Sequence, residues 1–268
     1  MASQYDEIGL SYESLKAQPA ALVERANLRA VMIPLLRRGP THPDKEVSVL
    51  DLACGTGYYS RLVLSWGASR VVGVDISSAM IEAARSQSQS QSQSDSGAGS
   101  GSDESKLIFE VGDCTRPLRL KSSSSSWGQK PTQQFDVVLG AWLLNYASSP
   151  SDLAAMFANV SSHLKPGGHF VGITPHPAPD LDSFAELFDP TKLDRDQGKY
   201  GATVAYAAIL PEGYGYRTKV TAHVKPREMS FESFHLRREV YEAAARDGGL
   251  NGRLEWMDVR LPRTEEEV

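Results

Sequence analysis

The chain has 268 residues and a mass of 29.2 kDa, enough for one large domain or two small ones. Hydrophobic residues make up 41% of it and charged residues 23%, a composition that excludes disorder of the whole chain. The formal charge is −5 and no stretch gathers the basic residues, which argues against a general nucleic-acid binder.

The cysteine count and the lengths of the apolar runs indicate where in the cell the protein is expected. Two cysteines, Cys54 and Cys114, exclude a disulfide framework. The first residues, MASQYDEIGL, have neither the charge nor the apolar run of a signal peptide, and no apolar stretch approaches the roughly 20 residues of a membrane helix. We therefore expect a cytoplasmic protein without a membrane partner, of undetermined oligomeric state.

The region before Val47 is helical in character. Pro19 suits the first turn of a helix, and apolar residues then recur at three- and four-residue steps as far as Leu36. Pro34 is expected to kink or end this helix, because proline lacks the backbone donor that a helix interior needs.

From Val47 onward, short apolar runs alternate with amphipathic segments, as in a parallel sheet with crossover helices. Near the end of the chain, two strands flank one further helix and are expected to close the sheet as a hairpin. The predicted fold is α/β, with a seven-stranded, mostly parallel sheet, helices on both faces and the last strand antiparallel. Strands are predicted at 47–53, 70–76, 107–113, 135–141, 169–175, 218–224 and 254–261, and helices at 58–66, 77–85, 151–163 and 236–246.

Three segments interrupt this regular alternation. Residues 86–105 and 121–133 are rich in serine and have little with which to build a core, so we expect solvated, disordered connectors. Residues 178–219 carry several Gly, Pro and Tyr without a clear period and are interpreted as an insertion on the substrate side.

The strongest motif is VLDLACGTG, which ends the first predicted strand and begins a helix. Gly55 and Gly57 permit a tight turn and a close approach of a ligand to the backbone, and Asp51 brings a carboxylate beside that turn. Asp75 ends the second strand, where an acidic side chain is placed to accept hydrogen bonds from ribose hydroxyls.

The details of the turn select among nucleotides. A dinucleotide site has a third glycine, and here that position is Ser60. The carboxylate of Asp51 would also disfavour a pyrophosphate, and it suits a ligand with an ammonium group, a sulfonium and no phosphate. That ligand is S-adenosylmethionine.

With these motifs, the chain resembles the class I S-adenosylmethionine-dependent methyltransferases from about Tyr5 to Leu261, apart from the serine-rich segments. The resemblance implies a Rossmann-like fold and cofactor contacts from the DLACGTG turn, the ends of the second and third strands, and FDVVLGAWLLNYA. Ala53 departs from the glycine that the family often has there, which is a common variant. The implied cofactor-binding residues are Tyr5, Tyr12, Asp51, Ala53, Gly55, Thr56, Gly57, Asp75, Ile76, Met80, Gly112, Asp113, Cys114, Ala141, Trp142 and Tyr146.

A finer resemblance points to small-molecule methyltransferases of the toxoflavin-synthase-like kind. It rests on YDEIGLSYES, LLNYA and SFESFHLRREVYEAAARDGG. In that pattern the N-terminal segment folds over the cofactor, which implies a helical lid at 1–46, a methyltransferase domain at 47–261 and a tail at 262–268. Tyr5 and Tyr12 are candidates for the lid, and packing of a terminal helix is the alternative role for each.

Methyl transfer is an in-line displacement, so positioning of the acceptor is the main task of the enzyme. Aromatic rings near the sulfonium assist by attracting the cation. The candidate catalytic residues are Tyr12, His176, which follows the fifth strand, and His235 in the FHL segment; a structural histidine is the alternative for the last two. No cluster with metal-ligand spacing occurs, so no metal is expected.

The leading hypothesis is methyl transfer to N or O of a small molecule, such as a secondary metabolite. A protein or RNA methyltransferase is a second hypothesis, although the NPPY-type turn of enzymes acting on DNA adenine or protein glutamine is absent. A third is a methyltransferase-fold protein that binds the cofactor and catalyses cyclisation or another step without methyl transfer.

Overall fold

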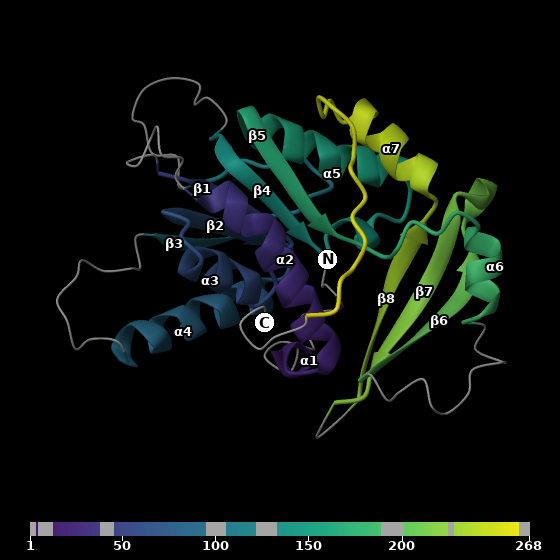
Figure 1. Ribbon diagram of the computed structural model, residues 1–268, viewed down its shortest axis with the longest axis horizontal. Coiled ribbons are helices and arrows are strands. Elements are labelled where there is room, and N and C mark those ends of the chain that lie inside the picture. Colours follow the sequence, from purple (N-terminus) through teal and green to yellow (C-terminus); the bar gives the residue numbers. More distant parts are fainter. Residues whose placement is uncertain are drawn as a thin grey trace.

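The computed structural model describes Gln4 and residues 13–37, 46–94, 106–121, 133–188, 201–224 and 228–262. It contains two separate sheets with helices around the larger one (Figure 1). In chain order the elements are α1 (Glu13–Lys16), α2 (Pro19–Leu36), β1 (Ser48–Leu52), α3 (Tyr58–Ser65), β2 (Arg70–Asp75), α4 (Ser78–Ser94), β3 (Leu107–Val111), β4 (Phe135–Ala141), η3 (Leu144–Tyr146), α5 (Pro150–His163), β5 (Leu164–Ile173), α6 (Leu181–Glu186), β6 (Ala202–Ile209), η5 (Pro211–Gly213), β7 (Gly215–Ala222), β8 (Met229–Leu236) and α7 (Arg238–Asp247).

The larger sheet has the strand order β3-β2-β1-β4-β5, and all its strand pairs are parallel. This confirms the Rossmann-like α/β fold and the five parallel strands predicted between 47 and 175. The central strands β1, β2 and β4 are buried along almost their whole length, because helices cover both faces.

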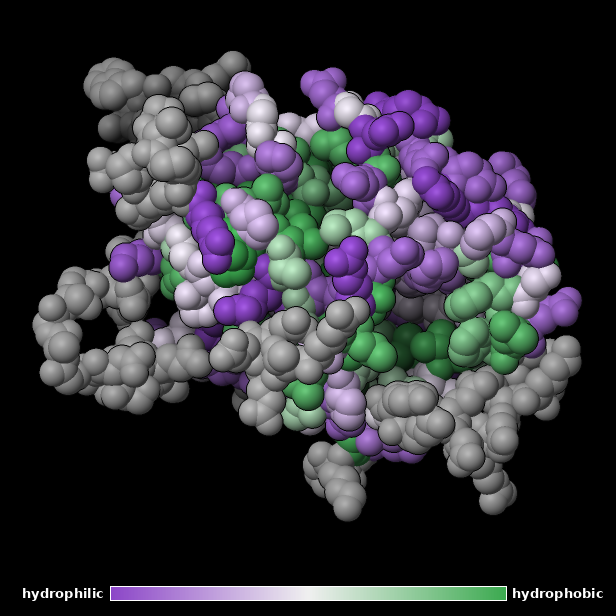
Figure 2. All heavy atoms as spheres, viewed as in Figure 1, coloured by the Kyte–Doolittle hydropathy of each residue, from purple (hydrophilic) through white to green (hydrophobic). Residues whose placement is uncertain are grey.

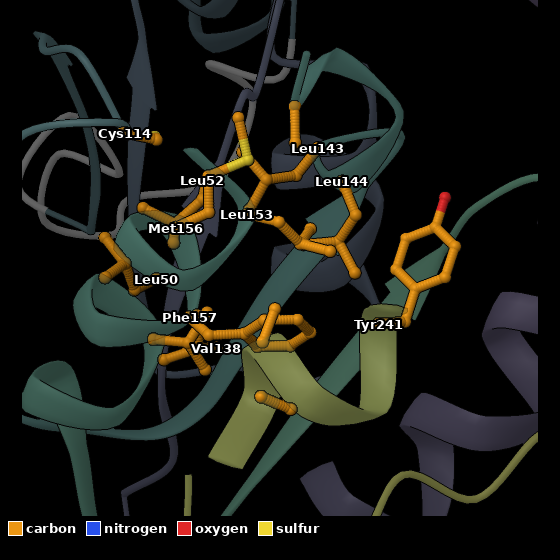
Figure 3. Packing of buried hydrophobic residues seen from close by; sticks show 14 of the residues in the cluster. Leu50, Leu52, Cys114, Val138, Leu143, Leu144, Leu153, Met156, Phe157 and Tyr241 are labelled. Carbon is orange, nitrogen blue, oxygen red and sulfur yellow. The ribbon is translucent and has the colours of Figure 1, made fainter. Parts of the chain in front are cut away.

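Side chains of alternate direction along β1 enter two different cores. Leu50 and Leu52 pack with α5 and α7 in one core, in which Figure 3 shows Met156, Phe157 and Tyr241. Val49 faces the opposite side, against α2 and α3. Helix α7 is amphipathic, and Figure 2 shows hydrophilic side chains over its outer surface.

The prediction of a single seven-stranded sheet is wrong in its last two strands. The strand predicted at 218–224 corresponds to β7, which lies in a separate antiparallel sheet of order β6-β7-β8. These three strands follow one another with short connections, so each pairs with its neighbour in the sequence and not with β5. Much of the segment 178–219 thus forms regular structure, namely α6, β6 and part of β7.

Residues 254–261 form no strand. They run in extended form past α2 (Figure 1), where the side-chain amide of Asn27 donates to the carbonyl oxygen of Arg260 at 2.7 Å and accepts from its N–H at 2.9 Å. Trp256 packs edge-on against Tyr241 of α7. These contacts hold the segment outside the larger sheet.

Two other predicted boundaries differ. Helix α2 continues two residues beyond Pro34 and ends at Leu36. Helix α4 extends to Ser94, so the first part of the serine-rich segment 86–105 is helical, and residues 95–105 lie outside the described part. The run of Ser and Gln contains no helix breaker before Gly97, so the helix that begins at Ser78 can propagate.

None of the helices in the described part is long and apolar enough to cross a membrane.

Candidate functional site

A cavity of about 440 Å³ lies at the carboxyl ends of β1, β2, β3 and β4. This is the edge at which parallel α/β sheets bind ligands. Two elements outside the larger sheet complete its wall, since Lys16 of α1 and Glu232 and Phe234 of β8 also line it. Figure 2 shows apolar side chains around the recess between the two sheets.

Most of the predicted cofactor-binding residues meet at this cavity. Asp51, which lies in β1, and Gly57, in the turn that follows, do not line it. Tyr5 and Tyr12 lie outside the described residues. The predicted residues that line the cavity are Ala53, Gly55, Thr56, Asp75, Ile76, Met80, Gly112, Asp113, Cys114, Ala141, Trp142 and Tyr146.

The turn between β1 and α3 needs its glycines. Gly55 has φ 55° and Gly57 has φ 78°, in the left-handed region that glycine adopts without strain. A Cβ atom at Gly57 would lie 2.6 Å from the ring of Phe109, so the turn also requires a close approach to β3. Ala53 adopts φ 58°, which explains why glycine is common at this position in the resembling family.

Asp75 ties this turn to the end of β2. Its Oδ2 accepts from the backbone N–H of Gly55 at 2.9 Å, and its Oδ1 accepts from the N–H of Ser77, also at 2.9 Å. Its side chain lines the cavity. The carboxylate therefore shapes the turn in addition to facing the space where a ribose is expected.

Asp51 lies beneath the turn and is 1% exposed. The hydroxyl of Ser60 donates to its Oδ2 at 2.5 Å. Burial raises the pKa of Asp51 to about 7, and the nearby carboxylate of Asp75 adds to this rise, while the hydrogen bond from Ser60 and the charge of Lys16 oppose it. Asp51 thus takes up and releases protons near neutral pH.

Both cysteines line the cavity as neutral thiols. Burial raises the pKa of Cys114 to about 12 and raises that of Cys54 well above its ordinary value. Neither is a thiolate nucleophile at neutral pH.

A partly buried polar cluster at the cavity wall was not predicted. The Oε2 of Glu24 accepts from Lys16 Nζ at 3.1 Å, from the hydroxyl of Tyr59 at 2.6 Å and from the indole N–H of Trp142 at 3.2 Å. The cluster joins α1, α2, α3 and the loop after β4. Lone charged residues in a helical pattern usually face solvent, so the sequence carried no signal for it.

The two candidate histidines do not line the cavity. His176 is exposed in the loop after β5. His235 is buried on the opposite face of β8 from Glu232 and Phe234, with its Nε2 2.5 Å from the carbonyl oxygen of His176 and its Nδ1 2.5 Å from the hydroxyl of Tyr206. Because a carbonyl only accepts, Nε2 carries the proton and Nδ1 accepts from Tyr206.

Among the residues that the structure describes, no three His, Cys, Asp or Glu side chains gather as a metal site.

Comparison with known proteins agrees with this geometry. Residues 49–168, which run from β1 into β5, match a family described as a methyltransferase domain. Residues 49–168 are therefore an S-adenosylmethionine-dependent methyltransferase domain. S-adenosylmethionine is the cofactor of such domains.

Two curated relatives match more than half of this chain. The O-methyltransferase cnsE of Penicillium expansum is 25% identical over 73% of this chain and 62% of its own length. The mRNA cap guanine-N(7) methyltransferase 1 of Arabidopsis thaliana is 28% identical over 61% of this chain and 41% of its own length. The chain thus spans less than two thirds of the length of these relatives.

Among solved structures, the CcbJ methyltransferase from Streptomyces caelestis matches 92% of this chain and 87% of its own, with a TM-score of 0.55 and 16% identity. At this identity the likeness concerns the fold.

Proposed function

We propose that the protein transfers the methyl group of S-adenosylmethionine to N or O of a small molecule in the cytoplasm, as part of secondary metabolism. The observation that carries the proposal is a cavity whose lining includes the glycine turn and Asp75 as well as Glu232 and Phe234 of β8. Its volume of about 440 Å³ is in the usual range for small-molecule sites.

The residues divide into two groups along this cavity. Asp75 and the end of β3 at Asp113 are proposed to bind the nucleoside, and the exposed side chain of Ile76, 53% accessible, is proposed to lie against the adenine. Trp142 and Tyr146, which follow β4, border the part between the nucleoside and β8. When bound, the cofactor supplies an electrophilic methyl group on a sulfonium.

In this proposal the protein acts mainly by positioning. Trp142 is held by its hydrogen bond to Glu24, which keeps an aromatic ring at the cavity wall, where it can attract the sulfonium cation. Exclusion of water by α1 and β8 strengthens such electrostatic contacts. Orientation of the acceptor supplies the rest of the rate increase.

The N-terminal residues are proposed to act as a lid. Glu13 of α1 accepts from the Thr56 hydroxyl at 3.1 Å and from Arg61 Nη2 at 2.7 Å, so α1 is fastened directly to the turn of β1 and α3. We propose that this lid comprises residues 1–46, that the methyltransferase domain comprises 47–261, and that 262–268 form a tail.

Two measurements test the proposed function. Calorimetry should show binding of S-adenosylmethionine and S-adenosylhomocysteine and no binding of NAD or FAD. Incubation with methyl-labelled cofactor and a panel of small amines, phenols and carboxylic acids, with a capped RNA and a protein mixture as further arms, should label a small molecule. Selective labelling of the RNA or protein arm would contradict the small-molecule assignment, and binding without any transfer would favour a non-transfer reaction.

A further inference from the structure

Strand β8 forms the wall of the cavity that faces the end of β4. Glu232 and Phe234 line the cavity, while Ser233 and His235 point to the other face of the sheet. On that other face, His235 packs against Phe184 of α6. Glu232 therefore brings a carboxylate to the side of the cavity opposite the nucleoside turn.

The backbone of Glu232 is held from both sides. In the β7 and β8 pair it lies opposite Lys219, and its N–H and carbonyl are both bonded by the side chain of Gln4 on the outer edge. A residue fixed in this way loses little backbone freedom when its side chain binds a ligand.

The other charges at the cavity wall have strong partners. Lys16 Nζ lies 3.1 Å from Glu24, and Asp75 accepts two backbone N–H groups. Asp113 accepts from the backbone N–H and the hydroxyl of Thr115, at 2.9 and 2.6 Å. The hydrogen bonds and the ion pair of these groups stabilise the cavity wall.

The contacts of Glu232 are weaker. Its Oε1 lies 3.4 Å from Nη1 of Arg217, and the two side chains are 56% and 46% exposed. An exposed ion pair of this kind contributes little to stability, so the carboxylate can bind a second cation at little cost. The position already accommodates one cationic side chain.

The lining also bears on proton transfer. No histidine is among the described residues that line the cavity, and both lining cysteines are neutral. A hydroxyl acceptor must lose its proton during the reaction, and the carboxylates of the lining, Glu232 among them, are the bases that remain for it. A neutral amine attacks with its lone pair and needs none.

We propose that the acceptor is a small primary or secondary amine whose nitrogen is bound by Glu232, with its apolar part against Phe234 and Trp142. This inference rests on the proposed methyl transfer. The ammonium form is captured by the carboxylate and gives up one proton to water. The amine nitrogen then forms a bond to the methyl carbon as the carbon–sulfur bond breaks, and the bonding pair stays on sulfur.

The charge that develops during methyl transfer also favours a carboxylate at the position of Glu232. The positive charge leaves the sulfur and appears on the nitrogen, so a carboxylate beside the nitrogen is favoured more strongly in the transition state than in the complex with the neutral amine. The methylated ammonium product keeps its remaining protons, and no further reactant is required.

The test uses the full chain saturated with S-adenosylhomocysteine and three probes of similar shape: 2-phenylethylamine, 2-phenylethanol and phenylacetate. Their dissociation constants are measured by calorimetry or ligand-observed NMR. We expect the wild type to bind the amine at least about fivefold more tightly than the alcohol, and Glu232→Gln to lose this preference. Glu228→Gln is the matched control, since Glu228 precedes β8, pairs with His223 and does not line the cavity.

Each outcome is decisive. If the wild type prefers the alcohol or the acid, shows no preference, or binds none of the probes, the amine proposal is wrong. It is also wrong if Glu232→Gln keeps the preference while its thermal unfolding and its affinity for S-adenosylhomocysteine match the wild type. If Glu232→Gln does not fold, the wild-type ranking alone decides. Failure of the wild type to bind S-adenosylhomocysteine would overturn the proposed function itself and this inference with it.

Discussion

The side-chain amide of Gln4 forms two hydrogen bonds with the main chain of Glu232. Nε2 donates to the carbonyl oxygen at 3.0 Å, and Oε1 accepts from the N–H at 2.9 Å. Because β8 is an outer strand of its sheet, Gln4 occupies the place where a further strand would bond. A residue near the start of the chain is thereby joined to the far wall of the cavity.

Replacing Gln4 tests whether this junction retains the ligand. We expect Gln4→Ala to raise the dissociation constant for S-adenosylhomocysteine by roughly fivefold or more, because two hydrogen bonds of about 0.5 to 1.5 kcal/mol each are lost. Calorimetry measures the affinity, and an unchanged constant would show that the junction plays no part in ligand retention.

Asp75 has both a structural and a binding role in this structure. Asp75→Ala removes the acceptor for the N–H groups of Gly55 and Ser77, so we expect an unfolding free energy lower by about 1 to 3 kcal/mol. The affinity for S-adenosylmethionine should fall at least roughly tenfold for loss of charged hydrogen bonds. Denaturant unfolding and calorimetry measure the two effects. Asp258→Ala, on an exposed residue of the C-terminal segment, is the control and should change neither.

Asp51 should make stability depend on pH. Its pKa is about 7 in the folded protein against 3.8 ordinarily, so between these values the folded state holds a proton that the unfolded chain has lost. The contribution of Asp51 to stability is therefore fully present below about pH 4 and declines as pH rises to about 7, by up to about 1.4 kcal/mol per pH unit. In Asp51→Asn this decline should vanish, as measured by urea unfolding at pH 5 and pH 8. An equal decline in the variant would show that another group is responsible.

His235 should act in the opposite direction. Burial lowers its pKa to about 4 from 6.5, so below pH 6.5 the unfolded chain takes up a proton that the folded protein does not. Stability should fall as pH drops from about 6.5 to 4, and in the wild type this partly cancels the effect of Asp51. The double variant Asp51→Asn, His235→Gln should be less sensitive to pH in this range than Asp51→Asn alone. The exposed His223→Gln in the same background is the control, and an equal effect would contradict the assignment to His235.

The larger sheet could be predicted from the sequence, whereas the pairing within the smaller sheet could not. The parallel strands and the turn at Gly55 could be predicted because their signals are local: apolar runs of strand length, capping residues and glycine at a left-handed position. The partner of β7 could not, since pairing with β5 or with a neighbour is settled by contacts far apart in the chain.

The same holds for single side chains at the site. His235 and Phe234 are neighbours in the sequence, but alternation along β8 sends only Phe234 to the cavity. Which of the two faces the ligand depends on where the strand docks. The partial burial of Lys16 and Glu24 likewise depends on how α1 and α2 pack against α3, which no local sequence pattern indicates.

Gly248, just after α7, shows how closely α7 packs against α5, the helix that lies on the larger sheet. A Cβ atom at this position would lie 2.7 Å from the carbonyl oxygen of Ala154 and 2.8 Å from the backbone nitrogen of Ala158, both in α5. Backbone atoms of a helix cannot move aside as a flexible side chain can, so Gly248→Ala must separate α7 from α5. We expect a loss of about 1 to 3 kcal/mol or more in unfolding free energy, measured with denaturant. Asp247→Ala, at the exposed preceding residue, is the control and should cost much less; equal stability of the two variants would show that α7 docks more loosely than these distances require.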